Sequence, residues 1–292
     1  MRRRCFRPLL GLLVLGLLLL FACSRVERHA ADTGRHRIVC LTPSSTEVVA
    51  ALGATDEIVG VDQYSVYPLA VQHLPKVGDY IAPNLETILA LHPDIAVLDA
   101  VQSQVRSKLQ AAGITTISLQ MMTIEDIRSG LHQVAGTLGR TAQADALIAR
   151  LDGDLARLRD QAASRRAAAG RAVRVLVVVD RQPGGLGGIY AAGPHTFLDE
   201  VLTLLGAENV LAASPLRYSN LSAEHVIALA PDVILETTPA ADAARARAEW
   251  NVLSSVPAVA HDRVYLVADP VLQAPGPRLA TGIARLLPLL WP

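Results

Sequence analysis

The chain has 292 residues, of which 51% are hydrophobic and 18% charged, and its 27 basic side chains balance its 27 acidic ones. This length is sufficient for two compact lobes, each with its own apolar core. The balanced charge excludes the basic surface that binding to nucleic acid requires, and three cysteines provide no disulfide framework.

The first 23 residues have the organisation of an export signal. Four arginines within residues 2–7 precede an apolar run of 14 residues, which is too short to span a bilayer comfortably and suits a signal peptide. The run closes with Leu20-Phe-Ala-Cys23, which resembles the lipobox of bacterial lipoproteins. This resemblance implies cleavage before Cys23 and lipidation of its sulfur, so that acyl chains anchor the protein. The alternative is an ordinary secretory signal in which Cys23 is incidental.

Five segments are predicted in chain order. They are a signal peptide at 1–22, a flexible tether at 23–35, a first lobe at 36–140, a connecting helix at 141–169 and a second lobe at 172–292. Removal of the signal peptide leaves 23 basic and 27 acidic residues, a net charge of −4.

In the predicted first lobe, short β-branched runs alternate with helical patterns. Strands are expected at 38–41, 58–61, 95–98 and 116–119, and helices at 46–52, 85–91 and 101–111. Gly53 and Gly113 follow two of these helices, where a glycine commonly ends a helix. Strand–helix alternation predicts a parallel sheet with helices on its faces.

One long helix is predicted between the two lobes. Residues 141–169 contain no proline, and Leu147, Leu151, Leu155 and Leu158 recur at spacings of four, four and three. At about 1.5 Å per residue the helix would be about 40 Å long. That length suits a stiff connection between lobes, and a long helix inside a single domain is the alternative.

The second lobe is predicted to repeat the first. Strands are expected at 173–179, 210–211, 233–235 and 264–267, and helices at 197–205, 223–229, 240–249 and 279–287. Residues 84–95 align with 222–233, which places Glu86 on Glu224, and 47–54 align with 200–207. The predicted fold is therefore α/β, with two parallel-sheet lobes joined by one long backbone helix and a ligand cleft between them.

Several ordered segments carry a family resemblance. They are 37–48, 60–68, 83–94, 193–200, 206–210 and 221–232. Together they resemble the periplasmic binding proteins for cobalamin, haem and ferric siderophores, over roughly residues 36–290, and most of all the cobalamin-binding member. The resemblance implies a monomeric substrate-binding lipoprotein of the cell envelope that serves an ABC importer, without catalysis or an intrinsic cofactor. The first expectation for the ligand is cobalamin or another corrinoid, and the alternative is a ferric siderophore or haem.

The resemblance also implies a docking role for Glu86 and Glu224. In the family, a glutamate at this place on each lobe docks into arginines of the dimeric permease. The alternative is that each acid only favours the positive end of its helix. Glu47 and Glu200 are assigned to structure instead, beside capping boxes at 44–47 and 196–199.

The ligand-binding residues are predicted by alignment with the cobalamin-binding relatives. Tyr64, Tyr80, Asp99 and Tyr218 should line the cleft. A cobalamin-binding relative has tryptophan at the places of Tyr80, Asp99 and Tyr218. Tyrosine suits stacking on a planar macrocycle, and a phenolate also suits ferric iron. The other candidates are Arg181 and Arg217, which could pair with ligand carboxylates, and Gln273.

Signals for other functions are weak. The glycine-rich run 184–188 lacks the spacing of a dinucleotide-binding loop, and the eight histidines form no zinc-binding pattern. No nucleophile–base pair stands out. A lipoprotein adaptor and an exported hydrolase or metal-dependent enzyme remain as alternatives to a solute receptor.

Overall fold

The structure is a computed structural model that describes residues 35–182, 184–237 and 242–292. Residues 36–292 form one compact unit. The predicted signal peptide and the tether up to residue 34, Cys23 included, lie outside the described residues.

The first lobe is built on a four-stranded parallel sheet, as predicted. The strands are β1 (Ile38–Cys40), β2 (Ile58–Val61), β3 (Ile95–Asp99) and β4 (Thr115–Leu119), in the order β2-β1-β3-β4. The helices are α2 (Pro43–Ala51), α3 (Leu85–Ala90), α4 (Ser103–Ala111) and α5 (Ile124–Leu138), of which α5 was not predicted.

Helix α2 begins three residues before its predicted start. Thr42 is the N-cap, because its hydroxyl accepts a hydrogen bond from the backbone N–H of Ser45, and Pro43 occupies the first helical position. The predicted capping box at 44–47 is therefore wrong, and Glu47 has no capping role.

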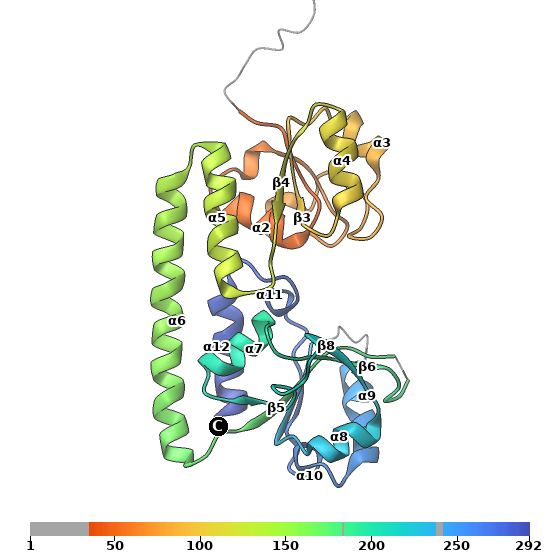
Figure 1. Cartoon of the computed structure of the whole chain (residues 1–292), viewed down its shortest axis with the longest axis vertical. Coiled ribbons are helices and arrows are strands. Elements are labelled where there is room, and N and C mark those ends of the chain that lie inside the picture. The colour runs from red at the N-terminus through yellow and green to blue at the C-terminus, as the bar shows by residue number, and fades with distance from the viewer. Residues whose placement is uncertain (1–34, 183, 238–241) are drawn as a thin grey trace, which may run out of the picture. The chain divides into compact units, whose positions relative to one another are not determined.

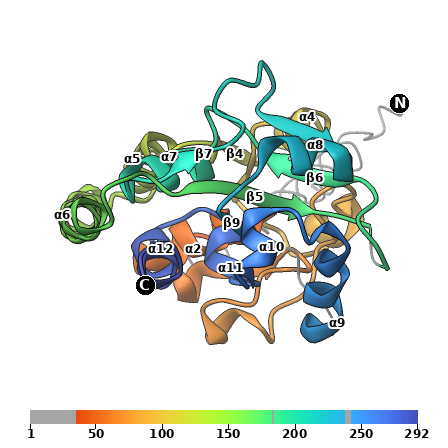
Figure 2. The same ribbon diagram turned by 90° about the horizontal axis from the view of Figure 1, so that it is seen from below.

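The connecting helix α6 (Thr141–Ala169) has the predicted bounds. It ends where Gly170 adopts a left-handed conformation, with φ of 73°. One face buries Ala144, Leu151, Leu155 and Leu158. The helix runs beside α5 in one part of its length and α12 (Leu279–Leu290) in the other, and is seen end-on in Figure 2.

The second sheet is mixed, where the sequence predicted a second parallel one. Its strands are β5 (Arg174–Asp180), β6 (Ile189–Ala192), β7 (Glu208–Asn209), β8 (Tyr218–Leu221), β9 (Val233–Glu236) and β10 (Val264–Leu266), with the path β10-β9-β5-β6-β8 and β7 beside β5. β6 and β8 run antiparallel to their neighbours and were not predicted. The glycine-rich run 184–188 reverses the chain between β5 and β6, with positive φ at Gly184 and Gly188.

Helices cover the second sheet largely as predicted. They are α7 (Phe197–Leu204), α8 (Ala223–Leu229), α9 (Ala243–Ala248), the short α10 (Pro257–Ala260) and α11 (Pro270–Gln273), and α12. The strand predicted at 210–211 is found two residues earlier in the chain, as β7 (Glu208–Asn209). Thr196 caps α7, but Asp199 accepts from the backbone of His195 and not from that of Thr196.

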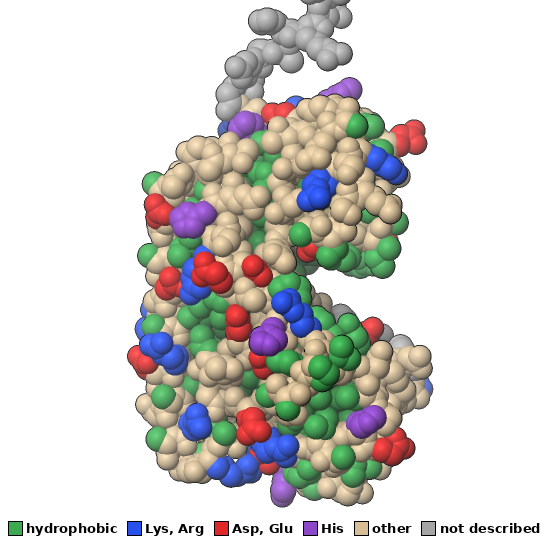
Figure 3. Space-filling model, in the orientation of Figure 1, with side chains coloured by type: hydrophobic (Ala, Val, Ile, Leu, Met, Phe, Trp, Pro, Cys, Tyr) green, Lys and Arg blue, Asp and Glu red, His purple; other side chains and the backbone are tan. Residues whose placement is uncertain are grey.

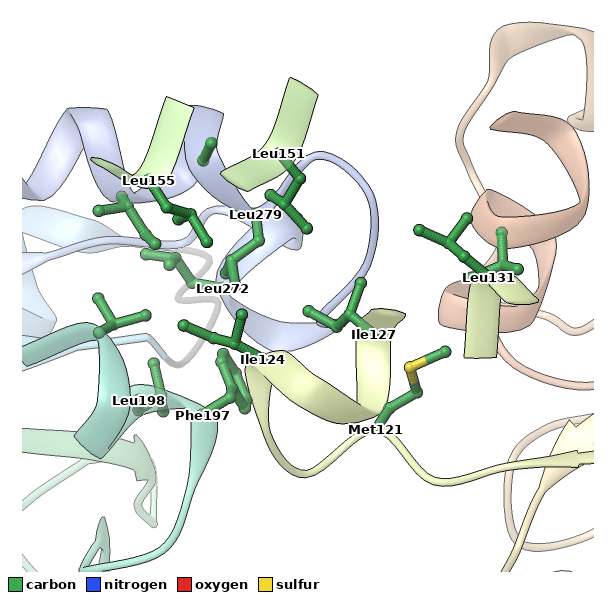
Figure 4. Packing of buried hydrophobic residues seen from close by; sticks show 14 of the residues in the cluster. Met121, Ile124, Ile127, Leu131, Leu151, Leu155, Phe197, Leu198, Leu272 and Leu279 are labelled. Carbon is green, nitrogen blue, oxygen red and sulfur yellow. The ribbon is translucent and has the colours of Figure 1, made fainter. Parts of the chain in front are cut away.

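One apolar core passes from the first lobe into the second. The largest cluster of buried side chains includes strand residues of both sheets and residues of α5, α6, α7 and α12. In Figure 4, Ile124 of α5 lies beside Phe197 of α7 and Leu272 of α11, near Leu151 and Leu155 of α6. Because these side chains pack without a break, rotation of one lobe against the other would disrupt close packing.

Within the described residues, no helix is both long enough and apolar enough to cross a membrane.

We predict that Leu155→Ala lowers the free energy of unfolding by about 2 to 5 kcal/mol, because the substitution leaves a cavity where α6 meets the core. Gly153→Ala in the same helix is the control. Its added methyl group meets only the end of Arg157, so it should stabilise by about 0.5 to 1 kcal/mol. Chemical denaturation followed by circular dichroism measures both. Equal free energies of unfolding for the two variants would contradict the packing of Leu155 in the continuous core.

Candidate functional site

A cavity of about 410 Å³ lies where the two lobes face each other. Figure 3 shows the hollow between the lobes on the side away from α6. The lining residues come from both lobes and from their junction: Thr42, Pro43, Ser44, Glu47, Tyr64, Val66, Tyr67, Tyr80, Asp99, Met121, Met122, Phe197, Tyr218, Pro270, Gln273, Ala274, Pro275 and Arg278.

The parallel first sheet explains how its residues meet at this cavity. Strands β1, β2, β3 and β4 all end at the same edge, and ligands bind outside the carboxyl ends of such strands. Thr42 follows β1, the loop 62–68 follows β2, Asp99 ends β3 and Met121 follows β4. Segments distant in sequence therefore form one wall.

Aromatic side chains from both lobes contribute to that lining. Tyr64, Tyr67 and Tyr80 are 58%, 44% and 41% exposed, so their rings offer free surface. Tyr218 lies across the cavity on β8, where it stacks on Tyr190 with ring centroids 5.3 Å apart. The predicted cleft residues Tyr64, Tyr80, Asp99 and Tyr218 are thus brought together, and their role in binding a ligand stays a prediction.

Tyr80 and Asp99 lie close enough to influence each other's pKa. Burial raises the pKa of both groups, and the nearby Asp99 charge adds to the effect on Tyr80. Gln102 joins the two loops, since its side chain accepts from the Asp99 N–H at 3.0 Å and donates to the Tyr80 carbonyl at 2.8 Å. Because its pKa is raised, the Tyr80 phenol is protonated at neutral pH.

A buried carboxylate holds the loop that carries Tyr64 and Tyr67. Asp62 is 1% exposed, and it accepts hydrogen bonds from the Tyr64 N–H at 2.8 Å and from the Ser65 hydroxyl. Ser65 in turn bonds the hydroxyl of Thr46 on α2 at 2.7 Å. Burial raises the pKa of Asp62. Sequence reasoning missed this network, because an aspartate after a strand gives no sign of its partners.

An ion pair crosses the cavity between the lobes. Glu47 of α2, 5% exposed, accepts two hydrogen bonds from the guanidinium group of Arg278, one of them from Nε at 2.9 Å. The centre of that guanidinium group lies 3.6 Å from the ring centroid of Tyr67. Sequence reasoning did not identify Tyr67 or Arg278 as residues that line the cavity.

Arg181, which was predicted to bind a ligand in the cleft, is not among the residues that line the cavity. It is 5% exposed, and its guanidinium group donates to Glu236 at 2.8 Å and to Glu249 at 2.5 Å. It also donates to the carbonyl groups of Gly185 and Ala246. Arg217 does not line the cavity either, whereas Gln273 does and donates to the carbonyl of Thr237.

Charge in the cavity is almost balanced. Within the part of the chain that the structure describes, Glu47, Asp99 and Arg278 are the charged side chains among the lining residues, and Arg278 is held by Glu47. No group of three or more potential metal ligands occurs among the described His, Cys, Asp and Glu residues. The lone described cysteine, Cys40, is buried, and burial raises its pKa strongly.

Glu86 and Glu224 occupy equivalent places on the two lobes. Each is exposed in the first turn of a short helix, α3 or α8, two residues after the N-cap Asn84 or Ser222. The two helices lie on different lobes (Figure 1). Hydrogen bonding at Ser222 lowers the pKa of Glu224, so this carboxylate is ionised at neutral pH.

Comparison with known proteins agrees with this architecture. Residues 38–271 match a family described as periplasmic binding protein. The chain belongs to that family. A periplasmic heme-binding protein of Pseudomonas aeruginosa is similar in structure, with a TM-score of 0.78 and 31% identity over 88% of this chain and 93% of that one.

Two curated relatives extend the comparison. An ABC transporter substrate-binding lipoprotein of Bacillus subtilis is 29% identical over 88% of this chain and 80% of its own length. The vitamin B12-binding protein of Salmonella typhimurium is 29% identical over 89% of each chain.

The function class follows from the family. The protein is an extracytoplasmic substrate-binding protein of an ABC importer, which works with a membrane permease. It is not an enzyme, and its ligand is a transported substrate rather than a cofactor. The predicted family, fold class and function class are confirmed.

Proposed function

We propose that the cleft binds a corrinoid, with cobalamin as the first candidate, and that the protein delivers it to the permease of an ABC importer. The observation that carries this proposal is a tyrosine-rich cavity in which Arg278, the one arginine among the described lining residues, is already paired. The vitamin B12-binding relatives, similar over most of the chain, support it.

The aromatic lining suits a large conjugated ring. Tyr64, Tyr67 and Tyr80 present free ring surface from the first lobe, while Phe197 and Tyr218 face them from the second. Rings on opposite walls can cover both faces of a planar macrocycle, which buries apolar surface and adds stacking energy. This feature supports a corrinoid or a haem equally.

The charge of the lining separates these two ligands. Haem has two propionate groups and many ferric siderophores are acidic, and such ligands are commonly held by arginines. In this cleft Arg278 is bonded to Glu47, and Arg181 is buried between Glu236 and Glu249. A corrinoid carries neutral amide groups around its ring, which Asp99, Gln273 and Ser44 can bond without a free cation.

A ferric haem or ferric siderophore is the second candidate, favoured by the Tyr80–Asp99 pair. A tyrosine that coordinates ferric iron must lose its phenolic proton. The Asp99 carboxylate lies near the Tyr80 phenol, so it is placed to take that proton. Similarity to the heme-binding protein of Pseudomonas aeruginosa supports the same candidate.

We predict that a form beginning at Ser24 binds cyanocobalamin in a one-to-one complex, and binds haemin or a ferric hydroxamate at least about a hundredfold more weakly, a difference of about 2.7 kcal/mol. Isothermal titration calorimetry measures all three. The control is Tyr80→Phe, which keeps the ring and removes the phenol. It should change corrinoid affinity less than about tenfold. Tight haemin binding that Tyr80→Phe abolishes would replace the corrinoid by haem.

We further propose that Glu86 and Glu224 dock onto the permease. Both carboxylates are exposed, and each lobe presents one at an equivalent place of the internal repeat. A dimeric permease has the same surface twice, so two matched acids can contact two matched basic sites. A helix-stabilising role would explain each acid alone but not their repetition.

The double variant Glu86→Ala with Glu224→Ala should abolish ligand uptake in cells and leave ligand affinity unchanged, because both residues lie outside the cavity. The control Glu125→Ala with Glu208→Ala removes two exposed carboxylates elsewhere and should preserve uptake. Uptake of labelled ligand and calorimetry measure the two effects. Normal uptake in the Glu86/Glu224 variant would exclude docking through these residues.

We propose, finally, that Cys23 carries the lipid anchor. The lipobox-like sequence before it supports this, as does the similarity to a substrate-binding lipoprotein of Bacillus subtilis. Cys23→Ser should move the protein from the membrane fraction to the soluble extracytoplasmic fraction, because it removes the acylated sulfur. Fractionation with immunoblotting measures the distribution, with Cys40→Ser as the control. Membrane retention of the Cys23→Ser protein would point to a different anchor.

A further inference from the structure

Two glutamates reach from one lobe to the other. Glu47 of α2 belongs to the first lobe and bonds Arg278, which lies between α11 and α12. Glu200 of α7 belongs to the second lobe and accepts a hydrogen bond at 2.6 Å from the backbone N–H of Ile124, at the start of α5. Each carboxylate therefore crosses the junction in the opposite direction to the other.

The internal repeat makes these glutamates equivalent. Residues 47–54 (Glu-Val-Val-Ala-Ala-Leu-Gly-Ala) align with 200–207 (Glu-Val-Leu-Thr-Leu-Leu-Gly-Ala) at an offset of 153. Gly53 and Gly206 follow the two helices at the same interval, and both have positive φ. The same helix of each lobe thus directs a carboxylate at the other lobe.

The Glu47 contact fixes the cavity wall. Glu47 is almost fully buried and binds the guanidinium group of Arg278 through both carboxylate oxygens, a geometry that limits rotation. The same guanidinium group stacks on Tyr67 of the first lobe. Gly276 packs against Glu47, because a Cβ atom there would lie 3.4 Å from its Oε2. Residues 276–278 are therefore held against the first lobe at three points.

The Glu200 contact fixes the junction. Its carboxylate lies at the N-terminus of the fifteen-residue helix α5, where the unpaired N–H groups and the helix dipole favour a negative charge. Helix α5 begins two residues after Met122, which lines the cavity. The contact therefore sets the position of the cavity floor relative to α7 and Phe197.

We propose that Glu47 and Glu200 are positioning residues that together set the separation of the two cleft walls. Without these contacts the continuous core still joins the lobes, but the walls lose two links outside that core, the bond between Glu47 and Arg278 beside Tyr67 and the bond from the Ile124 N–H to Glu200. The ligand readout of this proposal rests on the proposed binding function, whereas the separation of the lobes is measurable without any ligand.

The separation is measured by double electron–electron resonance between spin labels at Ser107→Cys on α4 and Ala228→Cys on α8, both exposed positions. The protein begins at Ser24, which retains every residue of the apolar core and leaves Cys40 as the only native cysteine. Cys40 is fully buried, and burial raises its pKa, so labelling is confined to the introduced sites. Glu47→Gln with Glu200→Gln should broaden the distance distribution and move its mean outward.

Three comparisons separate positioning from a simple loss of stability. Glu125→Gln, an exposed acid of α5 paired within its own helix, should leave the distribution unchanged. Arg278→Gln should change the distance distribution as Glu47→Gln does. The variant with both substitutions should broaden it no further than either alone, since the two residues share one contact. Leu155→Ala, which destabilises the fold, should lower the unfolding temperature without broadening the distribution.

The ligand readout uses cyanocobalamin and haemin as probes. For whichever probe the wild-type protein binds, Glu47→Gln with Glu200→Gln should raise the dissociation rate about tenfold or more, which corresponds to about 1.4 kcal/mol. An unchanged distance distribution in a folded double variant would overturn the proposal, as would a dissociation rate equal to that of the wild type. Failure of both probes to bind the wild type would instead contradict the proposed ligand, and the distance measurement would still decide on the positioning role.

Discussion

The continuous apolar packing of α5, α6, α7 and α12 is the constraint on which the rest of the structure depends. It joins two sheets of different topology into one compact unit, and it leaves the carboxyl ends of the first sheet facing the second lobe across the cavity. A cleft built in this way is largely formed before the ligand arrives. Affinity then depends on the shape and chemistry of the lining more than on closure of the lobes, because little ordering accompanies binding.

The distribution of arginines decides the chemistry of that lining. Arg181 is buried with two glutamates in the second lobe, and its neighbour Trp250 donates to Glu236 at 2.8 Å, so this charge is already paired within the second lobe. Arg278 reaches the cavity but is paired with Glu47. A cavity that is aromatic, and nearly neutral among its described residues, selects a ligand through stacking and neutral hydrogen bonds, which agrees better with an amide-bearing macrocycle than with a polyanion.

Features that depend on neighbouring residues were predicted from the sequence, whereas features that depend on contacts between residues far apart in the chain were not. Helix α6 was predicted with its observed bounds, because its 29 residues contain no proline and leucine recurs at helical spacing from 147 to 158, which are strong local signals. The parallel first sheet followed from strand–helix alternation. The antiparallel β6 and β8 were missed, since each has four residues and the sequence of β8, Tyr-Ser-Asn-Leu, shows no apolar run. Arg181 was misplaced because its partners Glu236 and Glu249 are 55 and 68 residues away, and no local pattern encodes that pairing.

The two pairs of equivalent glutamates in the internal repeat have different surroundings, which the sequence alone did not reveal. One matched pair of glutamates, Glu86 and Glu224, is exposed, whereas the other, Glu47 and Glu200, reaches across the junction between the lobes. The two contacts use different partners, one an arginine and the other the N-terminus of a helix, while both join the walls of the cleft. A carboxylate that reaches the opposite lobe from the same place in each half, whatever its partner, is what a role in setting the cleft requires.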